Sequence, residues 1–196
     1  MVPEKLGLIK RFLLRIARKP VWWFSPKMNA FFVNLMLREG LRKYEEYYGV
    51  EKGLEILDEI AEKAAEPVVF ELLDRIKMFF SKSVKDQKIL IEAAFDILFG
   101  GEETRIMYIR PDEEGVHRIV IRFYRCIFCA GVDDITSESL GEQSYIIPVI
   151  SGARMIAQMI QDQVGNEFDV HAKETSCFLR GDPYGEITVY YVPRKS

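Results

Sequence analysis

The fold is decided by the run from Ser144 to Val192, SYIIPVISGARMIAQMIQDQVGNEFDVHAKETSCFLRGDPYGEITVYYV. In its first part, apolar residues recur at three- and four-residue steps, which predicts an amphipathic helix that ends at Gly165. Apolar and polar residues then alternate, first from Phe168 and again from Ile187, which is typical of strands. Between the strands, Gly181-Asp182-Pro183 predicts a turn. This stretch is therefore predicted to be a helix followed by a β-hairpin.

Working outward, the same patterns predict helices over 25–48, from Glu51 to Ser81 with a break at Pro67, and over 85–99. Gly40 is expected to permit a close helix crossing. A strand pair follows over 106–110 and 116–124. The order predicts an α+β fold with N-terminal helices and then a ββ-α-ββ unit. That unit would form a four-stranded, mainly antiparallel sheet with helices on one face.

The C-terminal stretch also resembles a known family. The run that begins at Ser151-Gly152 and contains Lys173-Glu174-Thr175-Ser176-Cys177 and Gly181-Asp182-Pro183-Tyr184 resembles the end of the 4-vinyl reductase domain family. That family shares its fold with the TRAPP vesicle-tethering subunits, a fold that occurs in ligand binding, NO signalling and Golgi transport. The resemblance implies an apolar cavity between helices and sheet. It also implies a homodimer that pairs through the N-terminal helices.

Length and composition favour a single domain with an N-terminal appendage. The chain has 196 residues, which we divide into a basic amphipathic helix with an aromatic linker over 1–24 and one α+β domain over 25–196. A net charge of -3 and a pI near 5.6 argue against nucleic-acid binding. Three cysteines, an odd number, and no secretory signal favour a cytoplasmic protein. No apolar run is long enough to span a membrane.

The N-terminal segment has a charge opposite to that of the rest of the chain. Residues 1–20 carry a net charge of +5, which leaves -8 for the remainder. An apolar stripe that includes Leu6, Ile9 and Leu13 runs beside these cations, and Trp22-Trp23 follows. Such a segment is typical of a membrane surface, so peripheral membrane contact by residues 3–24 is one hypothesis. The alternative is that the stripe docks on the domain or on a second subunit.

The cysteines raise the hypothesis of a zinc site. Phenol-sensing members of the resembled family hold zinc with three Cys and one Glu, and this chain matches two of those positions, Glu174 and Cys177. The other two fall near Ser151 and at Gly185, which cannot bind zinc as thiolates. Cys126 and Cys129 could complete the set of four ligands. A β-bulge near Thr175 or Ser176 would then be needed to bring Glu174 and Cys177 together, and buried, metal-free cysteines remain the alternative.

A ligand cavity is the other candidate site. Its predicted lining residues are apolar side chains on the helices, which could equally form ordinary core. They are Phe31, Phe32, Phe80, Phe95, Phe99 and Ile156. The sequence contains no set of acid, base and nucleophile that favours catalysis. The leading hypothesis is a regulatory, non-enzymatic protein that binds a small hydrophobic ligand, and the alternative is a TRAPP-like scaffolding subunit at a membrane surface.

Overall fold

The computed structural model describes residues 4–5, 7–13, 15–16, 30–99, 104–125, 129 and 144–194. An N-terminal helix occupies residues 8–13 and 15–16. The later helices are α2 (Ala30–Tyr48), α3 (Val50–Ile76), α4 (Val84–Phe99) and α6 (Ile147–Val164), with the 3-10 turns η1 (Lys77–Phe79) and η3 (Phe178–Arg180). The strands are β1 (Thr104–Ile109), β2 (His117–Phe123), β3 (Phe168–Ser176) and β4 (Gly185–Pro193).

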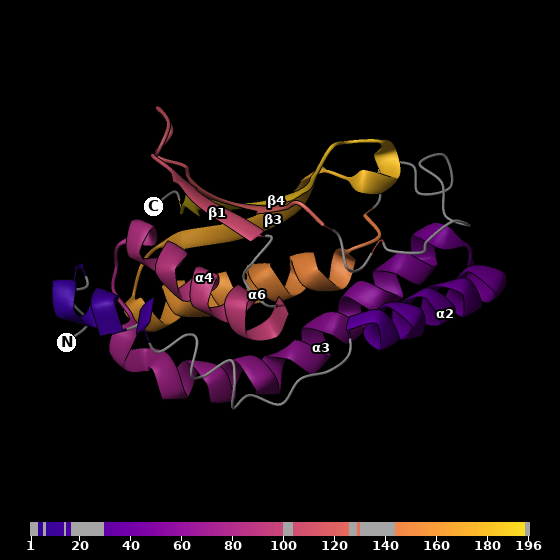
Figure 1. Cartoon of the computed structure of the whole chain (residues 1–196), viewed down its shortest axis with the longest axis horizontal. Coiled ribbons are helices and arrows are strands. Elements are labelled where there is room, and N and C mark those ends of the chain that lie inside the picture. The colour runs from indigo at the N-terminus through magenta and orange to yellow at the C-terminus, as the bar shows by residue number, and fades with distance from the viewer. Residues whose placement is uncertain are drawn as a thin grey trace.

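The four strands form one sheet in the order β1-β2-β4-β3, and every neighbouring pair is antiparallel. Each hairpin is formed by strands that are consecutive in the sequence, and the two hairpins meet where β2 pairs with β4. The helices lie on one face of this sheet, with α4 and α6 nearest to it (Figure 1). This arrangement confirms the predicted α+β architecture.

The main core lies between the sheet and the helices. The inward side chains of the two central strands are fully buried, as the period of two requires. They are Ile119, Ile121, Ile187, Val189 and Tyr191. Phe95 of α4 and Ala157 of α6 pack into the same cluster. The sheet therefore supplies a rigid wall against which α6 is held.

The ends of α6 are set by its sequence. Pro148 lies in the first turn, where its missing N–H leaves no donor unpaired. Gly165 ends the helix with φ 71°, a left-handed conformation that glycine adopts at little cost. Its N–H donates to the Asp162 carbonyl, and the Asn166 N–H donates to the Gln161 carbonyl. The predicted helix end at Gly165 is confirmed.

Two details of the helical layer differ from the predictions. α3 continues through Pro67 from Val50 to Ile76. Pro67 is exposed, so water can bond the carbonyl that the proline leaves free. A Cβ on Gly40 would have no neighbour within 4 Å, whereas one on Gly53 would lie 3.1 Å from Tyr44 Cβ. The close approach of α2 and α3 is therefore at Gly53.

The N-terminal helix packs on the domain through its polar side. Arg11 forms an ion pair with the buried Asp86 of α4 at 2.6 Å, and Lys10 donates to the Met78 carbonyl at 2.9 Å. The described side chains of the apolar stripe, Ile9 and Leu13 among them, are more than half exposed, so they do not dock on the domain. Among the described residues, no helix is long and apolar enough to cross a membrane.

Candidate functional site

A pocket of about 330 Å³ lies where α3, α6, β3 and η3 meet. Its walls are partly apolar and partly polar. They are formed by Asp58, Ser144, Ile147, Ile150, Ser151, Arg154, Ala172, Lys173, Glu174 and Arg180. This volume is at the lower end of the range for small-molecule sites. The resemblance implies an apolar cavity between helices and sheet; this pocket lies between those layers, but most of its lining residues are polar or charged.

Helix α6 contributes one wall because of its periodicity. Ile147, Ile150, Ser151 and Arg154 are three or four residues apart and so lie on one face. Arg154 is the one charged residue of α6 before Asp162. A charge on an otherwise apolar helix is a signal that could have identified this wall from the sequence.

Two polar pairs tie α6 to α3 along the pocket. The Ser151 hydroxyl donates to Asp58, and Arg154 forms an ion pair with Glu62. Asp58 and Glu62 are one helical turn apart, so the two pairs lie side by side. They satisfy polar groups at the pocket wall and fix the spacing of the two helices.

The strand wall contains an irregularity that positions Glu174. Glu174 pairs with Ile187 and Ser176 pairs with Glu186, so Thr175 is an extra residue in β3. With this bulge, the Ser144 hydroxyl and the Cys177 thiol lie beside the Glu174 carboxyl group and lower its pKa. The bulge that the zinc hypothesis required is therefore present, and Glu174 and Cys177 do lie together.

The carboxyl group of Glu174 is incompletely satisfied. Its Oε2 is buried and has no hydrogen-bond partner among the described residues. Burial raises the pKa of Glu174 above its ordinary value, and the polar groups of Ser144 and Cys177 only partly offset that effect. A buried acceptor without a partner costs about 1–3 kcal/mol, which the surrounding packing must offset.

Cys177 is the most enclosed part of this cluster. Its side chain is 1% exposed. Its N–H donates to Asp182 Oδ2 at 2.7 Å, which anchors the turn that η3 forms. Burial and the neighbouring Glu174 raise the pKa of Cys177 to about 11. The thiol is therefore held in its neutral, unreactive form.

The four residues of the zinc hypothesis are not assembled in the described part of the chain. Cys129 is in a disulfide and Cys177 is a free thiol, while Cys126 lies outside the described residues. Across the described ranges, no three His, Cys, Asp or Glu side chains gather closely enough to hold a metal ion. The set of Cys126, Cys129, Glu174 and Cys177 stays a prediction.

The predicted aromatic lining is not part of this pocket where it can be placed. Phe95 lies in the main core, with its ring 5.8 Å from that of Phe123. Phe80 and Ile156 belong to a second apolar cluster under α6. The side chains of Phe31, Phe32 and Phe99 lie outside the described residues. Their role as ligand contacts stays a prediction, while Asp58, Arg154 and Arg180 were missed as pocket residues.

Comparison with solved structures shows which known folds this chain resembles. The chain is similar to trafficking protein particle complex subunit 3 from Naegleria fowleri, crystallised covalently bound to palmitic acid. The TM-score is 0.63 at 16% identity, over 85% of this chain and 98% of the other. It is also similar to the phenol-responsive sensory domain of the transcription activator PoxR with phenol. Here the TM-score is 0.52 at 12% identity, over 85% and 76% of the two chains.

Sequence comparisons add no closer relative, since neither a protein-family model nor a curated protein sequence matches the chain. At these identities, the likeness to the two solved structures shows the fold alone. The chain therefore has a fold like that of a TRAPP subunit and of a sensory ligand-binding domain.

Proposed function

We propose that this chain is a non-enzymatic binding protein that holds a small ligand between α3, α6 and β3. The observation that carries the proposal is the pocket at this junction, whose wall includes the half-buried carboxyl group of Glu174. Both similar structures were determined with a small molecule, palmitic acid or phenol, which supports the proposal without identifying the ligand.

The walls indicate the kind of ligand. Ile147, Ile150 and Ala172 offer apolar surface, which favours a hydrophobic body. The Glu174 carboxyl group lies in the same wall, and the other lining residues are also mostly polar or charged. We therefore propose a small molecule with a hydrophobic part and polar groups. Because Asp58 and Glu62 of α3 bond to α6, occupancy would stabilise one arrangement of these helices, and a partner chain could sense it.

Filling the pocket tests this proposal. We expect Ile150→Trp to weaken ligand binding by roughly tenfold or more, because the indole would occupy space that the ligand needs. Ligand-detected NMR titration with a panel of phenols and fatty acids measures the affinities. The matched control is Ile60→Trp, an exposed position on α3, which should leave affinity unchanged. The proposal fails if no compound binds the wild-type chain, or if both variants bind equally well.

A second candidate function is that of a scaffolding subunit at a membrane surface. Such a subunit would form a homodimer through its N-terminal helices and contact the membrane with residues 3–24.

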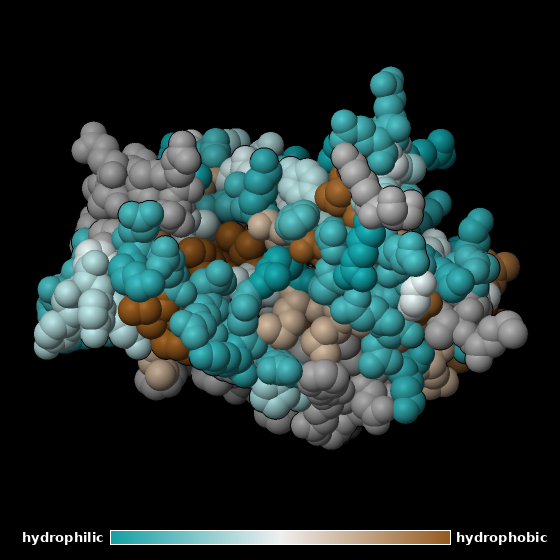
Figure 2. All heavy atoms as spheres, turned by 180° about the vertical axis from the view of Figure 1, so that it is seen from behind, coloured by the Kyte–Doolittle hydropathy of each residue, from teal (hydrophilic) through white to brown (hydrophobic). Residues whose placement is uncertain are grey.

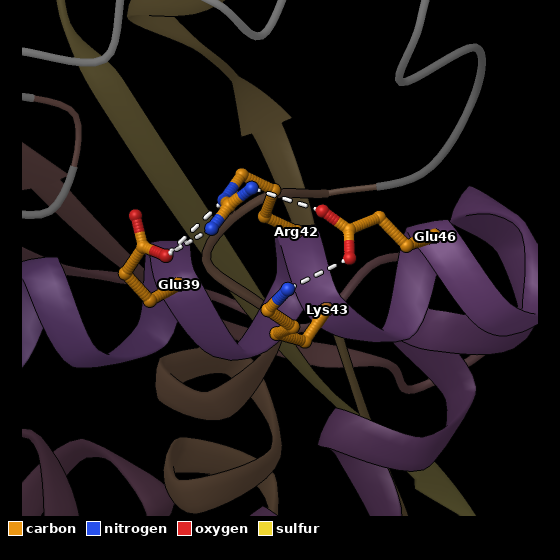
Figure 3. A network of polar contacts seen from close by, with 4 residues as sticks. All are labelled: Glu39, Arg42, Lys43 and Glu46. Atoms are coloured by element: carbon orange, nitrogen blue, oxygen red, sulfur yellow. Dashed lines mark hydrogen bonds and ion pairs between the residues drawn. The ribbon is translucent and has the colours of Figure 1, made fainter.

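Exposed surface on α2 favours this homodimer. Met36 and Tyr47 are 60% and 75% exposed. Met36, Gly40, Lys43 and Tyr47 lie on one face, and Gly40 leaves a flat spot between the two large side chains. On this face Lys43 binds Glu46, and beside it Arg42 binds Glu39 and Glu46 (Figure 3). Large apolar side chains among paired charges are typical of protein interfaces.

Sedimentation velocity of the purified chain tests the dimer. We expect the wild-type chain to sediment as a dimer and the Met36→Ser/Tyr47→Ser variant as a monomer, because the substitutions remove the two large apolar side chains of the face. The Ile109→Ser variant, at an exposed apolar position on β1, should remain dimeric. A monomeric wild-type chain, or a double variant that stays dimeric, would remove α2 as the interface.

A further inference from the structure

The N-terminal helix displays its apolar side to solvent. Its five described large apolar side chains are 52% to 83% exposed. They are Leu8, Ile9, Phe12, Leu13 and Ile16. The spacing of one, four, five and eight residues from Leu8 places all of them on one face of a helix. In Figure 2, apolar surface shows at the right-hand edge, the end of the molecule where Figure 1 places the N-terminus.

The opposite side of the helix is fixed to the domain by polar contacts. Asp86, which is 2% exposed, accepts an ion pair from Arg11 and a hydrogen bond from Ser81. Lys10 donates to the Met78 carbonyl, and Glu4 pairs with Lys82 at 3.2 Å. These contacts span the segment from η1 into α4. They hold the helix so that its apolar face is presented outward even when nothing covers it.

The charges around the apolar face indicate what covers it. Lys5 and Arg15 are exposed near its two ends, and the sequence adds Arg18 and Lys19 just beyond it. A symmetric contact between two copies would bring these like charges together. An anionic lipid surface would attract them, and lipid would accept the apolar side chains at the boundary between headgroups and acyl chains.

From this geometry we infer that the N-terminal helix binds an anionic lipid bilayer and lies in the plane of its surface. The apolar face, which includes Leu8, Phe12 and Leu13, would insert into the lipid. The ion pair between Arg11 and Asp86 would hold the helix to the domain. This inference rests on the second candidate function and names its contact face and lipid class. It does not depend on the ligand pocket, which lies on other elements.

Vesicle co-sedimentation of the full chain tests the inference. We expect binding to phosphatidylcholine vesicles that contain phosphatidylserine, and at least several-fold weaker binding to phosphatidylcholine alone. Phe12→Ser/Leu13→Ser should reduce the affinity by roughly a hundredfold, since each lost side chain removes about a factor of ten. The matched control is Ile60→Ser, an exposed apolar residue on α3 that should bind as the wild-type chain does.

A second readout uses the two tryptophans of the chain, Trp22 and Trp23, which follow the helix in the sequence. Their fluorescence should shift to the blue when vesicles with phosphatidylserine are added. Thermal unfolding of the double variant should match that of the wild-type chain, because the substituted side chains are exposed in the free protein.

Three results would overturn the inference. If the double variant binds vesicles as well as the wild-type chain, the membrane function stands and this face is wrong. If neutral and anionic vesicles bind equally, the lipid class is wrong. If the wild-type chain binds neither vesicle, the membrane function itself fails, and loss of the dimer in Phe12→Ser/Leu13→Ser would then identify a second copy as the occupant.

Discussion

Cys177 should react with iodoacetamide at least about a hundredfold more slowly in the native protein than in the urea-unfolded chain at about pH 8. The reason is its pKa, which rises from an ordinary 9.0 to about 11, chiefly through burial and next through the neighbouring Glu174 carboxylate. A rise of two pKa units lowers the reactive thiolate fraction by about a factor of a hundred. The 1% exposure of the side chain slows the reaction further. Mass spectrometry of the Cys177 peptide measures the rate.

Substitution of the neighbouring carboxylate provides the control for this experiment. Glu174→Gln removes one cause of the raised pKa, so labelling of Cys177 should become faster, whereas Glu167→Gln at an exposed position should have no effect. The pH dependence of stability has the same origin. Since the folded pKa of the thiol is raised, its contribution to stability is present below about pH 9 and is lost as the pH rises toward about 11. Native labelling as fast as in urea would contradict the buried geometry.

Arg11→Gln should lower the free energy of unfolding by about 2 kcal/mol, because it removes the ion pair between Arg11 and the buried Asp86 carboxylate. Asp86 is 2% exposed and pairs with Arg11 at 2.6 Å. We expect less than the 3–5 kcal/mol typical of breaking a fully buried pair, since Arg11 itself is 30% exposed. Urea denaturation measures the change. Arg15→Gln, an exposed arginine on the same helix, should alter stability by less than about 0.5 kcal/mol.

The double variant Arg11→Gln/Asp86→Asn tests whether the ion pair accounts for that loss of stability. If the loss comes from breaking this ion pair, removal of both charges should restore part of the stability. A double variant that loses the sum of the two single effects would show that the ion pair does not carry the interaction. In that case, the helix would be held to the domain by its other contacts.

The local parts of the fold could be predicted from the sequence because their signals are local. The period of α6, its end at Gly165 and the alternation of β3 and β4 depend on neighbours within a few residues, and all are confirmed. The need for a bulge near Thr175 also followed from geometry alone, since Glu174 and Cys177 would otherwise lie on opposite faces of the strand. Pro67 was misjudged because a break was expected where an exposed helix can tolerate the residue.

The candidate site was harder to predict because its residues are far apart in the sequence. Asp58 meets Ser151 across 93 positions, and no periodicity links an acid on α3 to a hydroxyl on α6. Aromatic residues were expected to line the cavity, yet Phe80 and Phe95 are packed in apolar clusters. The orientation of the N-terminal helix could not be predicted from the sequence either. In the sequence, Asp86 is an ordinary acidic residue in the first turn of α4. Its burial and its ion pair with Arg11 depend on tertiary packing.

The β2–β4 pairing has a consequence for how the chain folds. Each hairpin joins strands that are close in sequence. The pairing of β2 with β4, by contrast, brings together residues such as Arg122 and Glu186, which are 64 positions apart. Closing such a long loop carries an entropic cost that is met before the contacts form. The hairpins can therefore form early and independently, and the joining of the central strands should limit the folding rate. Until then the two central edges are unpaired, and this is the stage at which the chain is most exposed to aggregation.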